Sequence, residues 1–119
     1  MTVKEFYELI GGDYQTAVAR MMNDDFIKRM LTKFLANNAF SLMKQSYENK
    51  DAKGLFESAH TFKGVTANLA MTRLYDKACP IVEAMRDYQS ANEIDLSKEM
   101  GELEEEYLFA KSKIEELLG

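Results

Sequence analysis

The amino-acid sequence predicts an all-α protein, an antiparallel four-helix bundle with short capping helices at its N-terminus. Apolar residues recur at helical spacing through nearly all of the 119 residues, and no stretch alternates as a half-buried strand would. Six glycines and one proline are few for a fold with many tight turns. Helical segments joined by short connections pack antiparallel around one core. We therefore expect a single domain over residues 1–119.

Residues 1–23 are expected to form two short helices that cap one end of the bundle. The side chain of Thr2 can cap the first helix, and the pair Gly11-Gly12 would end it. The side chain of Asp13 can cap the second helix. Both helices are too short to form the bundle themselves, so we expect them to cover it.

The next segment carries the widest apolar stripe of the chain. Asn23 or Asp24 can begin this helix, and Asn37-Asn38 would interrupt the helical pattern before a further segment, AFSLMKQSYENK. The stripe consists of Phe26, Ile27, Met30, Leu31, Phe34 and Leu35. A stripe of this width indicates a helix that packs against a core.

Three longer segments follow. Asp51 can cap a helix that runs to Ala70, and Thr72 can cap the next helix. Pro80 lies inside that helix, where it removes one backbone donor and should kink or break it. The stretch SANEID, residues 90–95, is predicted to be a loop, and residues 96–118 a long amphipathic helix.

Composition excludes several classes of protein. The net charge of −5 argues against nucleic-acid binding, which depends on Lys and Arg at phosphates. One cysteine and one histidine are too few for a zinc site or an internal disulfide, and Cys79 is expected to be a buried apolar residue beside Pro80. No apolar run approaches the roughly 20 residues that span a bilayer. We expect a free-standing cytoplasmic domain that begins at Met1 and does not bind membranes.

His60, the only histidine, lies in the stretch AHTFKGVTANLA. On a helical wheel, one arc of this segment must be buried; it consists of Leu55, Ala59, Phe62, Thr66 and Leu69. His60 lies nearly opposite, which favours a histidine exposed to solvent over one packed in the core. It shares a strip with Lys53, Phe56, Glu57, Lys63, Gly64, Ala67 and Met71.

The strip contains unusually small residues next to His60. Gly64 and Ala67 follow it by four and seven positions, and glycine inside a helix costs about 1 kcal/mol relative to alanine. Clearing space beside the imidazole is one physical reason for this glycine; a contact between helices is another. Lys63, one turn after His60, could place its ammonium group against the oxygens of a phosphoryl group.

These residues resemble the signature of the histidine-containing phosphotransfer (HPt) domain family. Ala59, His60, Phe62, Lys63, Gly64, Ala67 and Leu69 occupy the matching places, and the resemblance extends over residues 24–118. Two positions differ from the family pattern. Position 70 is Ala where the family commonly has Gly, and no glutamine occurs between Thr72 and Tyr88, where many relatives have one that holds the imidazole or phosphate.

The resemblance implies a phosphoryl carrier in a bacterial-type multistep relay, which is not an enzyme with its own ATP-binding domain. It implies that His60 accepts a phosphoryl group from the aspartate of a response-regulator receiver domain, that Lys63 stabilises the transferring group, and that Gly64 and Ala67 let the partner approach. It implies no cofactor of the chain's own, with Mg²⁺ held by the receiver. A sensor or hybrid histidine kinase would supply the relay.

The strip around His60 also predicts a docking surface for the partner. Its expected residues are Lys53, Phe56, Glu57, Ala67 and Met71. The alternative function is a helical interaction module, a degenerate relative that binds a receiver or another signalling protein without being phosphorylated. A module of that kind would tolerate His60→Gln, whereas a carrier would lose all transfer.

Overall fold

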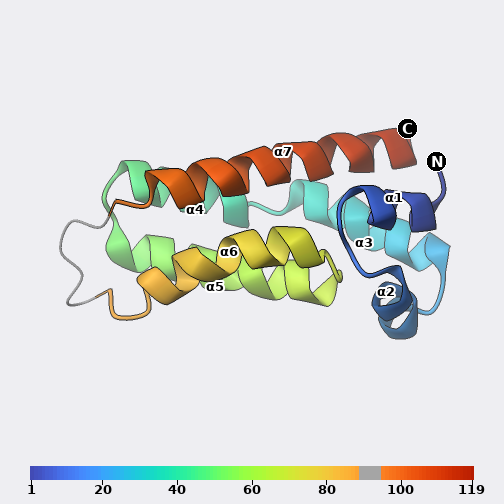
Figure 1. Ribbon diagram of the computed structural model, residues 1–119, viewed down its shortest axis with the longest axis horizontal. Coiled ribbons are helices and arrows are strands. Elements are labelled where there is room, and N and C mark those ends of the chain that lie inside the picture. The colour runs from blue at the N-terminus through green and yellow to red at the C-terminus, as the bar shows by residue number, and fades with distance from the viewer. Residues whose placement is uncertain (89–94) are drawn as a thin grey trace.

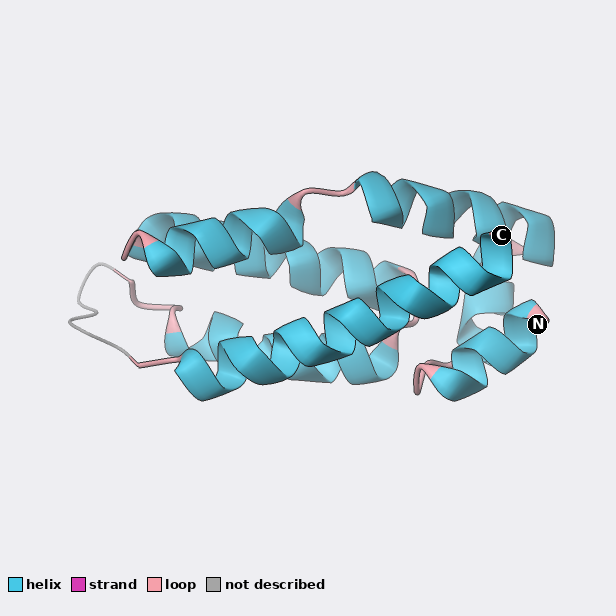
Figure 2. Ribbon diagram, turned by 90° about the horizontal axis from the view of Figure 1, so that it is seen from above, coloured by secondary structure: helices cyan, strands magenta, loops and turns pink. Residues whose placement is uncertain are grey.

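The computed structural model describes residues 1–88 and 95–119, and every regular element in these ranges is an α-helix (Figures 1 and 2). The helices are α1 (Val3–Leu9), α2 (Tyr14–Met21), α3 (Asp24–Ala36), α4 (Ala39–Glu48), α5 (Ala52–Asn68), α6 (Thr72–Ala84) and α7 (Ser97–Leu118). The molecule is elongated, 45 × 23 × 20 Å. The predicted loop over residues 90–95 lies outside the described residues, except for Asp95.

Four of the helices begin at a residue whose side chain accepts a hydrogen bond from the first turn. These N-cap residues are Thr2, Asp13, Asn23 and Asp51. The sequence predicts each of these caps; of the two candidates before the third helix, Asn23 is the N-cap and Asp24 is the first residue of α3. Such a cap satisfies a backbone N–H that has no partner within the helix. A local feature of the chain therefore sets each of these helix starts.

The connection between α5 and α6 differs from the prediction. The helix α5 ends at Asn68, short of the expected Ala70, and Ala70 adopts a left-handed backbone conformation with φ of +55°. The chain changes direction at this residue, and α6 begins two residues later, at Thr72. Thr72 is the first residue of α6 and not its cap; the N-cap is Met71, which makes no side-chain capping bond.

The helix α6 continues through Pro80, so the break that this residue could cause is not observed. A proline at this position leaves the carbonyl of Asp76 without its helical donor. Both Asp76 and Pro80 are exposed. Water can hydrogen-bond to the carbonyl on this face, which makes the proline tolerable.

The helices α4 to α7 run alternately in opposite directions, with α5 packed between α4 and α6 and with α6 packed against α7 (Figure 1). The long helix α7 also contacts α4, because the ring of Phe40 stacks on that of Tyr107 at 4.2 Å between centroids. The helices α3 and α4 follow one another along the side of the molecule, separated only by the turn at Asn37-Asn38 (Figure 2). One hydrophobic core includes buried residues from all of these helices and from α1 and α2.

The N-terminal helices α1 and α2 lie at one end of the molecule, beside the turn that joins α5 to α6 (Figure 1). Backbone hydrogen bonds join the two segments: Asp13 N–H donates to Ala70 O at 2.9 Å, and Arg73 N–H donates to Gly11 O at 3.2 Å. The end of α5 is therefore held by the N-terminal segment as well as by its neighbours in sequence.

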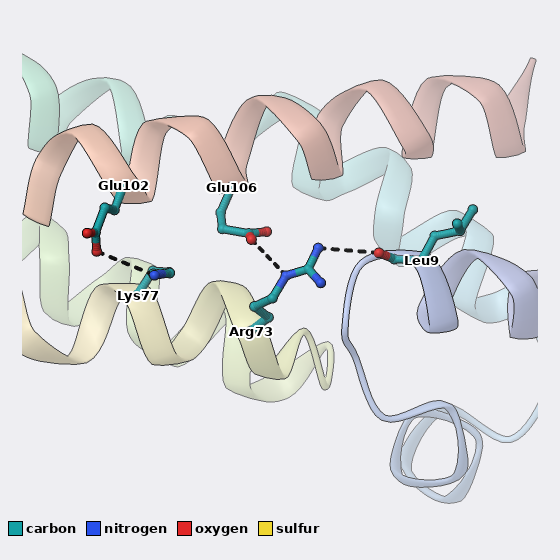
Figure 3. Close-up of polar contacts among 5 residues, drawn as sticks. All are labelled: Leu9, Arg73, Lys77, Glu102 and Glu106. Carbon is teal, nitrogen blue, oxygen red and sulfur yellow. Dashed lines mark hydrogen bonds and ion pairs between the residues drawn. The ribbon is translucent and has the colours of Figure 1, made fainter.

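A polar network adds to this attachment (Figure 3). Nε of Arg73, on α6, lies 2.7 Å from a carboxylate oxygen of Glu106 on α7, and an Nη group donates to Leu9 O at 3.3 Å. One side chain thus connects α6 to α7 and to the end of α1. A second ion pair, Lys77–Glu102 at 3.4 Å, lies further along the same two helices.

Candidate functional site

His60 is exposed on α5, as its position on the helical wheel predicts. The opposite arc is buried: Leu55, Ala59, Phe62, Thr66 and Leu69 are each at most 7% exposed. Thr66, the polar member of the arc, donates its hydroxyl hydrogen to backbone carbonyls of the preceding turn, at 3.1 Å from Phe62 O. The helix therefore buries one side completely and presents the imidazole on the other.

Gly64, one turn after His60, is exposed and borders open space. Apart from its two chain neighbours and the backbone of its own helix, a Cβ atom built at this glycine meets no heavy atom of the described residues within 4 Å. At Gly54 on the same helix, by contrast, a Cβ would lie 2.3 Å from a carboxylate oxygen of Asp51. Gly54 is thus explained by packing. Gly64 is not, because none of the helices in residues 1–88 and 95–119 packs against it.

The open space beside Gly64 does not serve the imidazole in its present position, because a methyl group at residue 64 would not reach it. The prediction that this glycine clears room beside His60 therefore does not apply to the imidazole as it lies in this structure. Beyond the two chain neighbours of Gly64, no side chain of the described residues lies in this space.

Lys63 is half-buried and turned toward α6. Its ammonium nitrogen lies 5.8 Å from the centroid of the Tyr75 ring. It also contributes to a lower pKa of Glu83, whose main cause is the hydrogen bond from Arg86, at 2.7 Å. The lysine side chain is long enough to leave this position and reach a group bound to His60, one turn away.

The face of α6 near Lys63 includes Cys79, which is half-buried and not buried as expected. A hydrogen bond with the Cys79 thiol, one turn along α6, raises the pKa of Tyr75. Tyr75 and Glu83 are the polar side chains that α6 brings to Lys63.

Aromatic rings lie on the other side of His60. The centroid of the half-buried Phe56 ring is 6.0 Å from that of the imidazole, with an interplanar angle of 37°. The same ring stacks on Tyr88 at 5.7 Å and 29°. The sequence predicts Phe56 near His60, but it carries no signal for Tyr88, which comes from the residues after α6.

The predicted partner-binding residues are only partly brought together. Lys53 and Glu57 are exposed and form a weak pair at 3.9 Å, and Ala67 is half-buried at the far end of the strip. The prediction that Met71 lies on this surface is wrong, because its side chain is fully buried. The helix ends before residue 71, and the left-handed turn at Ala70 directs the methionine into the core.

Two features near the strip escape prediction from the sequence. The guanidinium group of Arg20, on α2, donates to Ala67 O, which adds a positive charge at the end of the strip. A groove of about 440 Å³ lies between α4 and α5, and its lining includes Leu42, Glu57 and Thr61. The Arg20 contact joins residues 47 positions apart, and the groove depends on how α4 packs against α5, so no local pattern indicates either feature.

Residues 1–88 and 95–119 contain no group of three or more His, Cys, Asp or Glu side chains placed to hold a metal ion. Within these ranges no helix has both the length and the apolar character needed to cross a membrane. Comparison of the chain with models of protein families, with curated proteins and with solved structures finds no match.

Proposed function

We propose that this protein is a histidine phosphotransfer protein that carries a phosphoryl group on His60 between receiver-domain aspartates. In this proposal α4 to α7 form the four-helix bundle of such a domain, and α1 to α3 extend one end of it. The observation that carries the proposal is the exposed His60 beside Gly64. A helix-interior glycine that packs against nothing costs stability, and the approach of a partner protein to His60 gives a reason to keep it.

The chemistry of the step requires only an accessible imidazole. The lone pair on Nε2 of neutral His60 attacks the phosphorus of an aspartyl phosphate, and the P–O bond to the aspartate breaks. The aspartate carboxylate leaves with the electron pair, and the imidazole proton on Nδ1 passes to solvent. The product retains a reactive P–N bond, so a second aspartate can take the phosphoryl group in the reverse reaction.

Lys63, one turn from His60, is a cation that can balance the charge of the transferring group. Its ammonium group would leave the face of Tyr75 and approach the phosphoryl oxygens. No metal ligand is required of this chain, because Mg²⁺ would be held by carboxylates of the receiver. Partners of this kind would place the protein in the cytoplasm, downstream of a sensor or hybrid histidine kinase.

The departure from the family pattern at position 70 has a structural explanation that supports the proposal. Ala70 adopts the left-handed conformation, with φ of +55°, which glycine adopts most readily. The turn that glycine favours is therefore present, formed here by alanine.

The proposal is tested by incubating the protein with Mg²⁺ and a panel of prephosphorylated receiver domains. Intact mass should show one added phosphoryl group, which is labile in acid and stable in alkali. His60→Gln is the matched variant, because the chain has no other histidine. An adduct that forms on the parent and not on His60→Gln supports a carrier.

Failure of every receiver to phosphorylate the folded parent protein would contradict the proposal. The alternative function would then remain, a helical module that binds a signalling partner and is not phosphorylated. Binding of a receiver with equal affinity by the parent and by His60→Gln would then identify that module.

A further inference from the structure

Three aromatic rings form a row that ends at His60. Tyr88 stacks on Phe56 at 5.7 Å, and Phe56 lies 6.0 Å from the imidazole. Both separations fall in the range in which aromatic rings attract one another, about 4.5–7 Å. Phe56 and Tyr88 are partly buried and pack against the hydrophobic core. The row is therefore anchored at one end, and only its last ring is exposed.

The direction of side chains on a helix explains why the imidazole meets Phe56. The Cα–Cβ bonds of α5 tilt toward its N-terminus, so a side chain lies over the turn that precedes it. For His60 that turn carries Phe56, four residues earlier. The turn that follows carries Gly64, which has no side chain to offer a contact. The imidazole thus has an aromatic neighbour on one side and open space on the other.

We propose that Phe56 and Tyr88 are positioning residues that hold the imidazole of His60 in one orientation for transfer. The inference rests on the proposed function and assigns to these two residues a role in it. A ring held against Phe56 keeps clear of the open side at Gly64, from which the partner would approach. Tyr88 acts through Phe56, because it restricts the movement of the phenyl ring that the imidazole contacts.

The first test measures the orientation of His60 without any partner. The ring protons of His60 are assigned by NMR in the parent, in Phe56→Leu, in Tyr88→Leu and in Tyr88→Phe. A neighbouring phenyl ring shifts these resonances through its ring current. We expect Phe56→Leu to move them toward the positions seen in urea-unfolded protein, Tyr88→Leu to move them less, and Tyr88→Phe to leave them in place.

The second test measures transfer from the receiver that phosphorylates the parent fastest. We expect Phe56→Leu and Tyr88→Leu to lower the maximal rate about tenfold or more, since misplacement of a reacting group costs this much. For Tyr88→Leu, whose residue is not part of the predicted docking surface, the receiver concentration that gives half the maximal rate should not change. Tyr88→Phe, which keeps the ring, should transfer at the parent rate.

Phosphoramidate supplies a control for the reactivity of the histidine. It is a small donor whose P–N bond breaks as the imidazole attacks, with ammonia as the leaving group. It can approach the imidazole in any orientation, so all variants should react with it at the parent rate. Circular dichroism establishes that each variant is folded. If Phe56→Leu does not fold, Tyr88→Leu, whose residue follows the end of α6, takes its place in the comparison.

The outcomes separate the two proposals. Transfer by Phe56→Leu and Tyr88→Leu at the parent rate would overturn the positioning role, as would His60 resonances that do not respond to loss of the Phe56 ring. If no receiver phosphorylates the parent, the proposed function fails. The NMR comparison still decides whether Phe56 and Tyr88 orient His60.

Discussion

The hydroxyl of Tyr7 donates a hydrogen bond to the carbonyl of Leu69 at 2.8 Å, across 62 positions of sequence. Tyr7 is fully buried on α1, and Leu69 is the C-cap of α5. Carbonyls at the end of a helix have no partner within it. The N-terminal helix therefore completes the hydrogen bonding of the helix that carries His60, which gives α1 a structural role at the candidate site.

Replacing Tyr7 by Phe should lower the free energy of unfolding by about 1–2 kcal/mol, because the buried carbonyl of Leu69 loses its donor. Urea unfolding followed by circular dichroism measures the difference. Tyr14→Phe is the matched control: its hydroxyl bonds to Asp24 near the surface, where water can replace it, so the loss should stay below about 0.5 kcal/mol. Equal losses in the two variants would contradict the argument.

The same tyrosine predicts a dependence on alkaline pH. Burial raises the pKa of Tyr7 above its ordinary value, so the folded protein retains a proton that the unfolded chain releases near pH 10. The stability conferred by the protonated hydroxyl is complete below about pH 10 and is lost as the pH rises toward the folded pKa. Tyr7→Phe has no such proton.

The stability difference between the parent and Tyr7→Phe should therefore shrink by about 1.4 kcal/mol per pH unit above pH 10. Urea midpoints of both proteins at pH 8, 10 and 11 measure it. Lysines and other tyrosines titrate in both proteins alike, so their contributions cancel in the difference. A difference that stays constant over this range would show that the hydroxyl titrates normally in the fold.

Much of the helical pattern can be predicted from the sequence because its causes are local. An N-cap acts on the first turn of its own helix, and Thr2, Asp13 and Asp51 each begin a helix where the chain pattern places one. The buried and exposed faces of α5 follow from the helical repeat, which is why His60 was expected in solvent.

The errors arise where the cause is not local. Met71 would lie beside His60 if α5 continued, but a left-handed residue ends the pattern, and alanine is an unusual choice for that conformation. The stacking of Tyr88 on Phe56 depends on how α6 packs against α5, which no spacing within either segment determines. The hydrogen bond from Arg20 to Ala67 O likewise depends on how α2 packs against the end of α5, which no spacing within either segment determines.

The network around Arg73 predicts a difference between two ion pairs on the same helices. Arg73→Ala should lower the free energy of unfolding by about 1–2 kcal/mol, since the side chain pairs with the largely buried carboxylate of Glu106 and also bonds to Leu9 O. Lys77→Ala should cost less than about 1 kcal/mol, because the Lys77–Glu102 pair is open to solvent. Urea unfolding of the two variants measures both, and an equal loss would show that the bond to α1 contributes nothing.

Lys50, after the end of α4, also adopts a left-handed conformation, with φ of +56°. Because it is exposed, Lys50→Gly should raise the free energy of unfolding by about 0.5–1 kcal/mol, the relief of the left-handed conformation less the entropy cost of glycine. Lys53→Gly removes the same charge in the first turn of α5 and should lower it, by less than about 1 kcal/mol. Thermal unfolding of the pair should shift in opposite directions; a shift of both to lower temperature would contradict the prediction.

Substitutions of Gly64 should change the free energy of unfolding and the rate of phosphoryl transfer in opposite senses. Gly64→Ala should raise the free energy of unfolding by about 1 kcal/mol, because alanine favours the helix and its methyl group meets nothing. The same methyl group should hinder a partner that approaches His60. We therefore expect a more stable protein that accepts a phosphoryl group from a receiver more slowly, and a larger loss of transfer for Gly64→Leu.

Gly101 on α7 provides the control, because a Cβ built there also meets no heavy atom of the described residues within 4 Å, apart from its two chain neighbours and the backbone of its own helix. Gly101→Ala should stabilise the protein by a similar amount, since it too is an exposed glycine inside a helix. It should leave transfer to His60 unchanged. If Gly64→Ala and Gly64→Leu also transfer at the parent rate, the space beside His60 is not used by a partner, and the glycine needs another explanation.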